Sequence, residues 1–211
     1  MITLSPHLLV ATATAFVGVG EAPDGGAAPA FLSLLRQQVG RPEVVPFSVA
    51  AHEDANWDAA FVFHCGYWSH FDHRSDRSAW PVAPVRSARE LGAFASERHV
   101  LRDEPHAGDV FLQYSPSQCG FVRAGIVAQV ICRRLGPDRG RIHDVLTIEA
   151  GTGTHGELGG HQILRIMRRI SSRSGDRFVR WAELEPAGLT RPGAVPSRPR
   201  VWSEENLLKA A

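Results

Sequence analysis

The sequence has few cysteines, no excess of charge of either sign and no long apolar run. Its three cysteines, Cys65, Cys119 and Cys132, are spread over 211 residues and form no CxxC pair. This pattern argues against a disulfide framework and gives no support to a zinc site, and no cofactor is expected. The formal net charge of +1, from 23 basic and 22 acidic residues, predicts no binding to nucleic acid or to an anionic membrane.

The N-terminus also lacks the features of a targeting segment. Residues 1–20 are apolar, but no basic region opens them, and Thr12 and Thr14 interrupt the apolar run. No stretch of about 20 apolar residues is present to span a bilayer. The sequence therefore predicts a cytoplasmic protein, unless another factor exports it.

Helical patterns fill the first half of the chain. Ser5-Pro6 is typical of an N-cap followed by proline in the first turn, and Ser87-Ala-Arg-Glu90 has the form of a capping box. The polar, proline-containing residues 69–84 are expected to form a loop. The predicted helices cover residues 6–16, residues 31–39, a stretch from about Asn56 through Tyr67, and a stretch that opens at Ser87.

The second half is rich in valine, isoleucine and phenylalanine between turn residues, which is typical of strands. Helices followed by strands predict an α+β domain over residues 1–185, with helices packed on an antiparallel sheet of about five strands. The predicted strands cover residues 109–114, 121–133, 141–150, 161–170 and 178–183.

Residues 186–211 form a tail of different composition, in which prolines and arginines alternate before a possible short terminal helix. One interpretation is a disordered terminus. The other is an arm that docks on a protein partner through Trp202, Leu207 and Leu208.

Six short fragments, taken in order, resemble the pattern of the CHAP and NlpC/P60 amidases, a superfamily of papain-like cysteine peptidases. For example, residues 56–62, Asn-Trp-Asp-Ala-Ala-Phe-Val, resemble the family's Pro-Trp-Cys-Ala-Ala-Phe-Val segment, and residues 123–127, Arg-Ala-Gly-Ile-Val, resemble His-Val-Gly-Ile-Val. The resemblance implies a papain-like fold over roughly residues 6–183. The other fragments are residues 17–21, 105–110, 147–152 and 178–181.

This chain departs from the family pattern at the residues that carry catalysis. The resemblance places Asp58 where the family has its nucleophilic cysteine, at the start of a helix, and Arg123 where it has its histidine base. An arginine stays protonated and cannot act as a base. Glu149 matches the third, orienting residue. Cys65 lies two helical turns beyond Asp58, too far along the helix to replace the nucleophile, and is expected to be a buried structural cysteine.

Aspartate and arginine carry the same charges as the family's thiolate and imidazolium. We therefore hypothesise a salt bridge between Asp58 and Arg123, with Glu149 as a second acceptor; the alternative is that both side chains face water independently. Trp57, Asp58, Arg123 and Glu149 are expected to line the old cleft, where they could bind a ligand without catalysis.

Other clusters give weaker signals. The groups His52-Glu53-Asp54 and His70-Phe-Asp72-His73 lack the spacing of a metalloprotease, so no metal site is predicted. Arg165, Arg168 and Arg169 are interpreted as a solvated strand face.

Three functions remain open. The favoured one is a catalytically inactive pseudoenzyme that serves as a structural or partner-binding subunit of a larger assembly. The second is a module that binds peptidoglycan or a cell-wall peptide in the vestigial cleft. The third is a hydrolase with an altered site in which Asp58 acts as the nucleophile.

Overall fold

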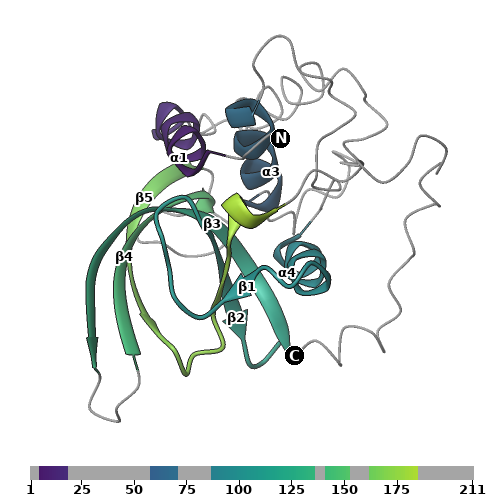
Figure 1. The fold of residues 1–211 in the computed structure, drawn as a ribbon, viewed down its shortest axis with the longest axis vertical. Coiled ribbons are helices and arrows are strands. Elements are labelled where there is room, and N and C mark those ends of the chain that lie inside the picture. The colour runs from purple at the N-terminus through teal and green to yellow at the C-terminus, as the bar shows by residue number, and fades with distance from the viewer. Residues whose placement is uncertain (1–4, 19–57, 71–86, 136–140, 153–161, 185–211) are drawn as a thin grey trace, which may run out of the picture.

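The described part of the chain folds into three α-helices and a six-stranded antiparallel sheet, which is an α+β architecture (Figure 1). The computed structural model describes residues 5–18, 58–70, 87–135, 141–152 and 162–184. The predicted helix over residues 31–39, the 136–140 connection and the tail from residue 186 lie outside these ranges.

Each described helix begins with a residue suited to its first turn. Helix α1 (Pro6–Ala15) is capped by Ser5, whose hydroxyl accepts the N–H of Leu8. Helix α4 (Ala88–Glu97) is capped in the same way by Ser87, which accepts the N–H of Glu90, so both predicted caps are confirmed. Helix α3 (Asp58–His70) has an acidic residue in its first turn, where the helix dipole favours negative charge.

The sheet has the strand order β1-β6-β2-β3-β4-β5, and every pair of neighbours is antiparallel. The long central strands β3 and β4 each carry bulges, which bend the sheet. The strands are β1 (Leu101–Arg102), β2 (Val110–Ser115), β3 (Gly120–Leu135), β4 (Arg141–Thr152), β5 (Gln162–Ser171) and β6 (Arg177–Val179).

Three sequence-based boundaries need correction. Over the described ranges the sheet has six strands rather than about five, because the two-residue strand β1 is too short to leave a pattern in the sequence. The strand predicted over residues 178–183 ends at Val179 and gives way to the 3-10 turn η2 (Trp181–Glu183). Helix α3 runs through His70, so Ser69 and His70 are helical and not part of the predicted loop.

The two faces of the sheet carry different cores. Ile126, Ile148 and Ile163 pack with residues of α1, α3 and α4 in the main hydrophobic core. Val127 and Val145, their neighbours in β3 and β4, belong to a separate cluster that contains no helical residue. Because successive strand residues point to opposite faces, the helices cover one face of the sheet (Figure 1), and the second cluster lies on the other face.

Candidate functional site

Asp58 joins the first turn of α3 to the sheet through its carboxylate. Its Oδ1 accepts the backbone N–H of Ala59 at 2.5 Å, and its Oδ2 accepts the backbone N–H of Ala124 at 2.6 Å. The pairing of β3 with β4 begins at Ile126 and Ile148, so Ala124 lies just beyond the end of that ladder. Asp58 therefore satisfies a backbone donor that the neighbouring strand does not reach, and none of its own surface is exposed.

Burial changes the acidity of this carboxyl group. Desolvation raises the pKa of Asp58 from 3.8 to about 7, because the charged form loses its hydration. The hydrogen bonds from Ala124 and Ala59 and the charge of Arg123 oppose this rise, and the charge of Glu149 adds to it. Asp58 therefore keeps its proton to a much higher pH than a solvated aspartate does.

Arg123 forms its ion pair with Glu149 inside the protein. Its Nη1 lies 3.0 Å from Glu149 Oε2, and neither side chain is more than 1% exposed. Arg168 donates two further hydrogen bonds to the same carboxylate, at 2.9 and 2.7 Å, and Thr147 donates a third at 2.6 Å. Glu149 is therefore the anionic centre of a buried cluster, which we call the Glu149 cluster: Arg123, Thr147, Glu149 and Arg168.

Gly125 provides the space for this cluster. Gly125 lies on the β3 strand beside Glu149, and a Cβ atom built on it would come within 2.6 Å of Glu149 Cγ. Any larger residue would push the Glu149 side chain out of its present position. The glycine is thus required by the close approach of a side chain and not by a turn.

The salt bridge expected between Asp58 and Arg123 is wrong as a direct contact. Both oxygens of Asp58 accept backbone N–H groups, and the carboxylate that contacts Arg123 is Glu149, as the hypothesis of a second acceptor allowed. Asp58 and Arg123 are nevertheless close enough to interact, since the charge of Arg123 lowers the pKa of Asp58. The structure thus brings Asp58, Arg123 and Glu149 together, and all three are buried.

Arg168 belongs to the Glu149 cluster, although the sequence pattern predicts a solvated strand face for Arg168 together with Arg165 and Arg169. The side chain of Arg168 is 20% exposed and points to the face that carries Glu149. The alternation along β5 was the available signal, because it places Arg168 on the opposite face from Arg165 and Arg169.

The cysteines and the tail were also assigned from sequence. Cys65 is fully buried in the main core, and burial raises the pKa of its thiol well above the usual value, which confirms a structural role. Cys119 is exposed, and Cys132 is half-buried. Four of the residues assigned from sequence lie outside the described residues: Trp57, Trp202, Leu207 and Leu208. The two clusters of histidine and acidic residues, 52–54 and 70–73, also lie outside them, apart from the backbone of His70.

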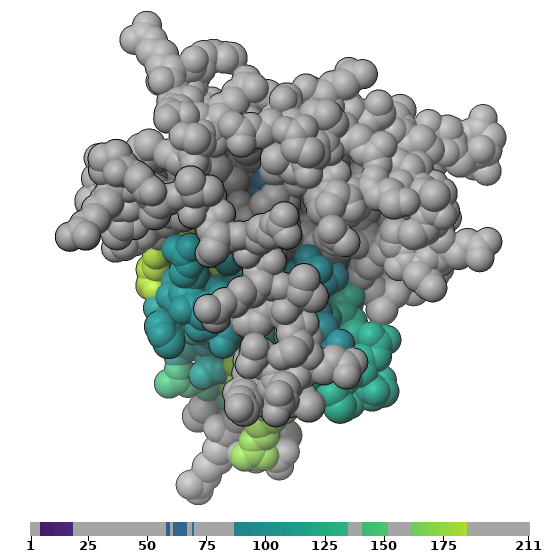
Figure 2. All heavy atoms as spheres, turned by 90° about the vertical axis from the view of Figure 1, so that its right-hand side faces the viewer, coloured from purple at the N-terminus to yellow at the C-terminus, as the bar shows by residue number. Residues whose placement is uncertain are grey.

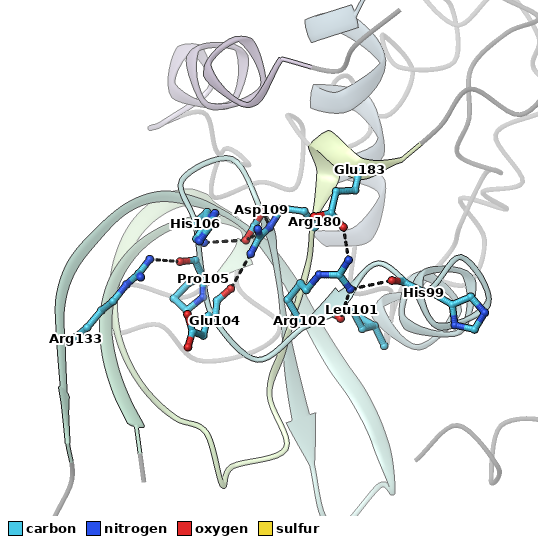
Figure 3. A network of polar contacts seen from close by, with 10 residues as sticks. All are labelled: His99, Leu101, Arg102, Glu104, Pro105, His106, Asp109, Arg133, Arg180 and Glu183. Atoms are coloured by element: carbon cyan, nitrogen blue, oxygen red, sulfur yellow. Dashed lines mark hydrogen bonds and ion pairs between the residues drawn. The ribbon is translucent and has the colours of Figure 1, made fainter. Parts of the chain in front are cut away.

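Figure 3 shows a second network of polar contacts. Several of its residues line a pocket of about 450 Å³ near the start of β4. Arg180 pairs there with the buried Asp109 at 2.9 Å and donates to the backbone oxygen of Glu104 at 3.1 Å. Desolvation raises the pKa of Asp109 to about 6. The residues that line the pocket are Arg102, Asp103, Glu104, His106, Arg141, Ser172 and Arg180.

The charges around this pocket balance each other. Arg102 pairs with Glu183, Arg141 pairs with Glu104, and Arg177 pairs with Asp103. Sequence reasoning missed this region because its arginines come from strands far apart in the chain, so no local motif marks it. Since each of these arginines already has an acidic partner, the pocket has little excess charge with which to attract an ion.

No protein-family model, no curated protein and no solved structure matches this chain. Among the described helices, none is both long and apolar enough to cross a membrane. The described residues also contain no cluster of three or more side chains suited to holding a metal ion.

Proposed function

We propose that this chain is a catalytically inactive relative of the CHAP and NlpC/P60 amidases that serves as a structural or partner-binding subunit. One observation carries the proposal. Asp58 and Arg123, which the sequence resemblance aligns with the family's cysteine and histidine, are buried and hydrogen-bonded to the protein's own groups.

The contacts of these residues support an architectural role. Asp58 holds the start of α3 against β3, and Arg123 holds β3 against the Glu149 side chain of β4. Both oxygens of Asp58 accept hydrogen bonds from the backbone, so whichever oxygen attacked a substrate carbonyl would have to move away from its backbone donor. A buried arginine offers no base to activate a nucleophile.

The α+β architecture, with a helix that starts against the central strands of an antiparallel sheet, is compatible with a papain-like domain. In that fold family the catalytic cysteine opens such a helix. Under this proposal the polar residues of the old site stabilise the domain, and partner binding falls to other surfaces, including the tail with Trp202, Leu207 and Leu208.

Two assays on the purified full chain test the absence of catalysis. Incubation with peptidoglycan and with wall-derived peptides should release no new amines, and the Asp58→Asn variant should behave in the same way. Amine release that is lost in Asp58→Asn would overturn the proposal in favour of an altered hydrolase.

Affinity capture tests the subunit role. The tagged chain, expressed in its native cells, should retain a protein partner in stoichiometric amount, and a variant that ends at residue 185 should lose it. Recovery of wall fragments in place of a protein partner would favour the alternative, a peptidoglycan- or peptide-binding module that uses the vestigial cleft.

A further inference from the structure

Strand β5 forms one end of the sheet, and within the described ranges its only strand partner is β4. It is 10 residues long, whereas strands average about five to six. An edge strand presents a row of backbone N–H and C=O groups that another extended chain can pair with. At the start of β5 the Ile163 C=O already accepts the N–H of Gly18 at 2.9 Å, so the edge relevant to a partner begins after Ile163. Proteins usually shorten, cover or twist such edges, so a long one is a candidate binding surface.

The side chains of β5 alternate in a pattern that limits what could bind. Ile163 belongs to the main core, so Arg165, Met167 and Arg169, at alternate positions after it, lie on the same face. All three are exposed, and Met167 is 58% exposed although it is apolar. Beyond the part covered by helices, this face therefore presents arginine, methionine and arginine in a row along the edge.

The positive charge of this row is only partly neutralised. Asp144 in β4 pairs with Arg169 at 3.0 Å, but it also pairs with Arg134 at 3.0 Å, so one carboxylate serves two arginines. Arg165 lies opposite Ile148 and thus has no acidic residue across from it in β4. Leu146 lies opposite Met167 and extends the apolar centre of the row inward.

We infer that the edge of β5 binds an extended, acidic segment of a partner protein, which adds to the sheet as a further strand. The segment would carry an acidic, an apolar and an acidic residue at alternate positions. These would lie opposite Arg165, Met167 and Arg169, where directly facing side chains of opposite charge attract. Since the row is symmetric about Met167, the segment can pair in either direction.

A second copy of this chain fits the same edge poorly. Antiparallel pairing of two β5 strands about Met167 would place Arg165 of each copy opposite Arg169 of the other. Like charges directly opposite each other in a sheet are destabilising. The arginines therefore disfavour self-association while leaving the edge available to an acidic partner.

This inference rests on the proposed role as a partner-binding subunit, but it uses a surface separate from the tail. The probe is a displayed library of random eight-residue peptides, selected on the immobilised full chain. The test variant is Arg165→Glu/Arg169→Glu. The control, Arg89→Glu/Arg98→Glu, makes the same change in charge at exposed residues of and next to α4, which reaches the surface in Figure 2.

The selected peptides should be enriched in acidic residues at alternate positions. Their affinity should fall at least tenfold for the β5 variant, stay within twofold for the α4 control, and fall when proline replaces a central residue of the peptide. Circular dichroism and thermal unfolding should show both variants folded.

No selected sequences, sequences without acidic enrichment, or equal binding to the β5 variant would each overturn the inference. A chain that ends at residue 185 should bind the peptides as the full chain does. If the tail-dependent partner is still captured but no peptide binds, the inference about the β5 edge is wrong, and the proposed function as a partner-binding subunit stands.

Discussion

The protein contains two networks of arginines and carboxylates, and the Arg123–Glu149 pair of one differs from the Arg102–Glu183 pair of the other chiefly in burial. In the Glu149 cluster, Arg123 and Glu149 are at most 1% exposed. In the network near the pocket, the side chains of Arg102 and Glu183 are 37% and 44% exposed. Removing one partner of a buried pair leaves the other charge in the interior, where water does not solvate it. When one partner of an exposed pair is removed, water solvates the charge that remains. Similar contacts should therefore differ several-fold in their effect on stability.

The largest effect is expected from Glu149→Gln. This substitution leaves Arg123 buried without its carboxylate and should lower the free energy of unfolding by about 3–5 kcal/mol. Urea denaturation followed by circular dichroism at pH 7 measures the change. A loss below about 1 kcal/mol would mean that the Glu149 cluster stabilises the fold no more than an exposed ion pair does, and the expected difference between the two networks would be wrong.

The next effect is a dependence on pH that should disappear in Asp58→Asn. Because the pKa of Asp58 is raised to about 7, its neutral form is favoured in the folded state. The stability that this group contributes is complete below its unfolded pKa of 3.8 and is lost as the pH rises through 7. Between these values, the unfolding free energy of the wild type minus that of the variant should fall by up to about 1.4 kcal/mol per pH unit.

Urea denaturation of both proteins at pH 5, 6, 7 and 8 gives this difference. His64, whose pKa burial lowers to about 4, has the opposite dependence and destabilises the fold as the pH falls below 6.5. Its contribution is common to both proteins and cancels in the difference. A difference that is constant from pH 5 to 8 would mean that Asp58 is ionised in the fold like a surface aspartate.

An intermediate effect is expected from Gly125→Ala. The new methyl group would meet Glu149 Cγ and displace the carboxylate from Arg123, at a cost of about 1–3 kcal/mol. Thermal unfolding measures the loss, and it should be much smaller when the same change is made in the Glu149→Ala background, which lacks the Cγ atom. Fully additive losses would show that Gly125 does not act through Glu149.

The smallest effect is expected from Glu183→Gln, the matched control for Glu149→Gln. It breaks the ion pair with Arg102 at the surface and should lower the free energy of unfolding by no more than about 1 kcal/mol. Raising the salt concentration should reduce this small difference further. A loss as large as that of Glu149→Gln would show that the surface network acts as a single structural unit.

The sequence predicted those features that depend on local patterns. Ser5 and Ser87 were identifiable as caps because a serine just before a helix commonly accepts a hydrogen bond from the backbone N–H three residues later. The five longer strands were identifiable from segments rich in valine, isoleucine and phenylalanine between turn residues. Strand β1 was not, since two residues form it only by pairing with Val179 and Phe178.

The site was predictable in its membership but not in its pairing. Asp58, Arg123 and Glu149 were singled out together, and the structure places them together. Which acid pairs with Arg123 depends on where the β3–β4 ladder ends, because this leaves the N–H of Ala124 for Asp58. Arg168 joined the cluster through the register of β5 against β4, which no linear motif encodes.

The contact from Asp58 to Ala124 also bears on the order in which the chain folds. It joins residues 66 positions apart, whereas β3, β4 and β5 follow one another in the chain and pair as neighbours. Closing a long loop costs more entropy than closing a hairpin, so the β3–β5 meander is expected to form first and α3 to dock on it later. The contact of Asp58 with Ala124 would then form late in folding and hold α3 on the sheet. Substitution of Asp58 should therefore speed unfolding more than it slows folding.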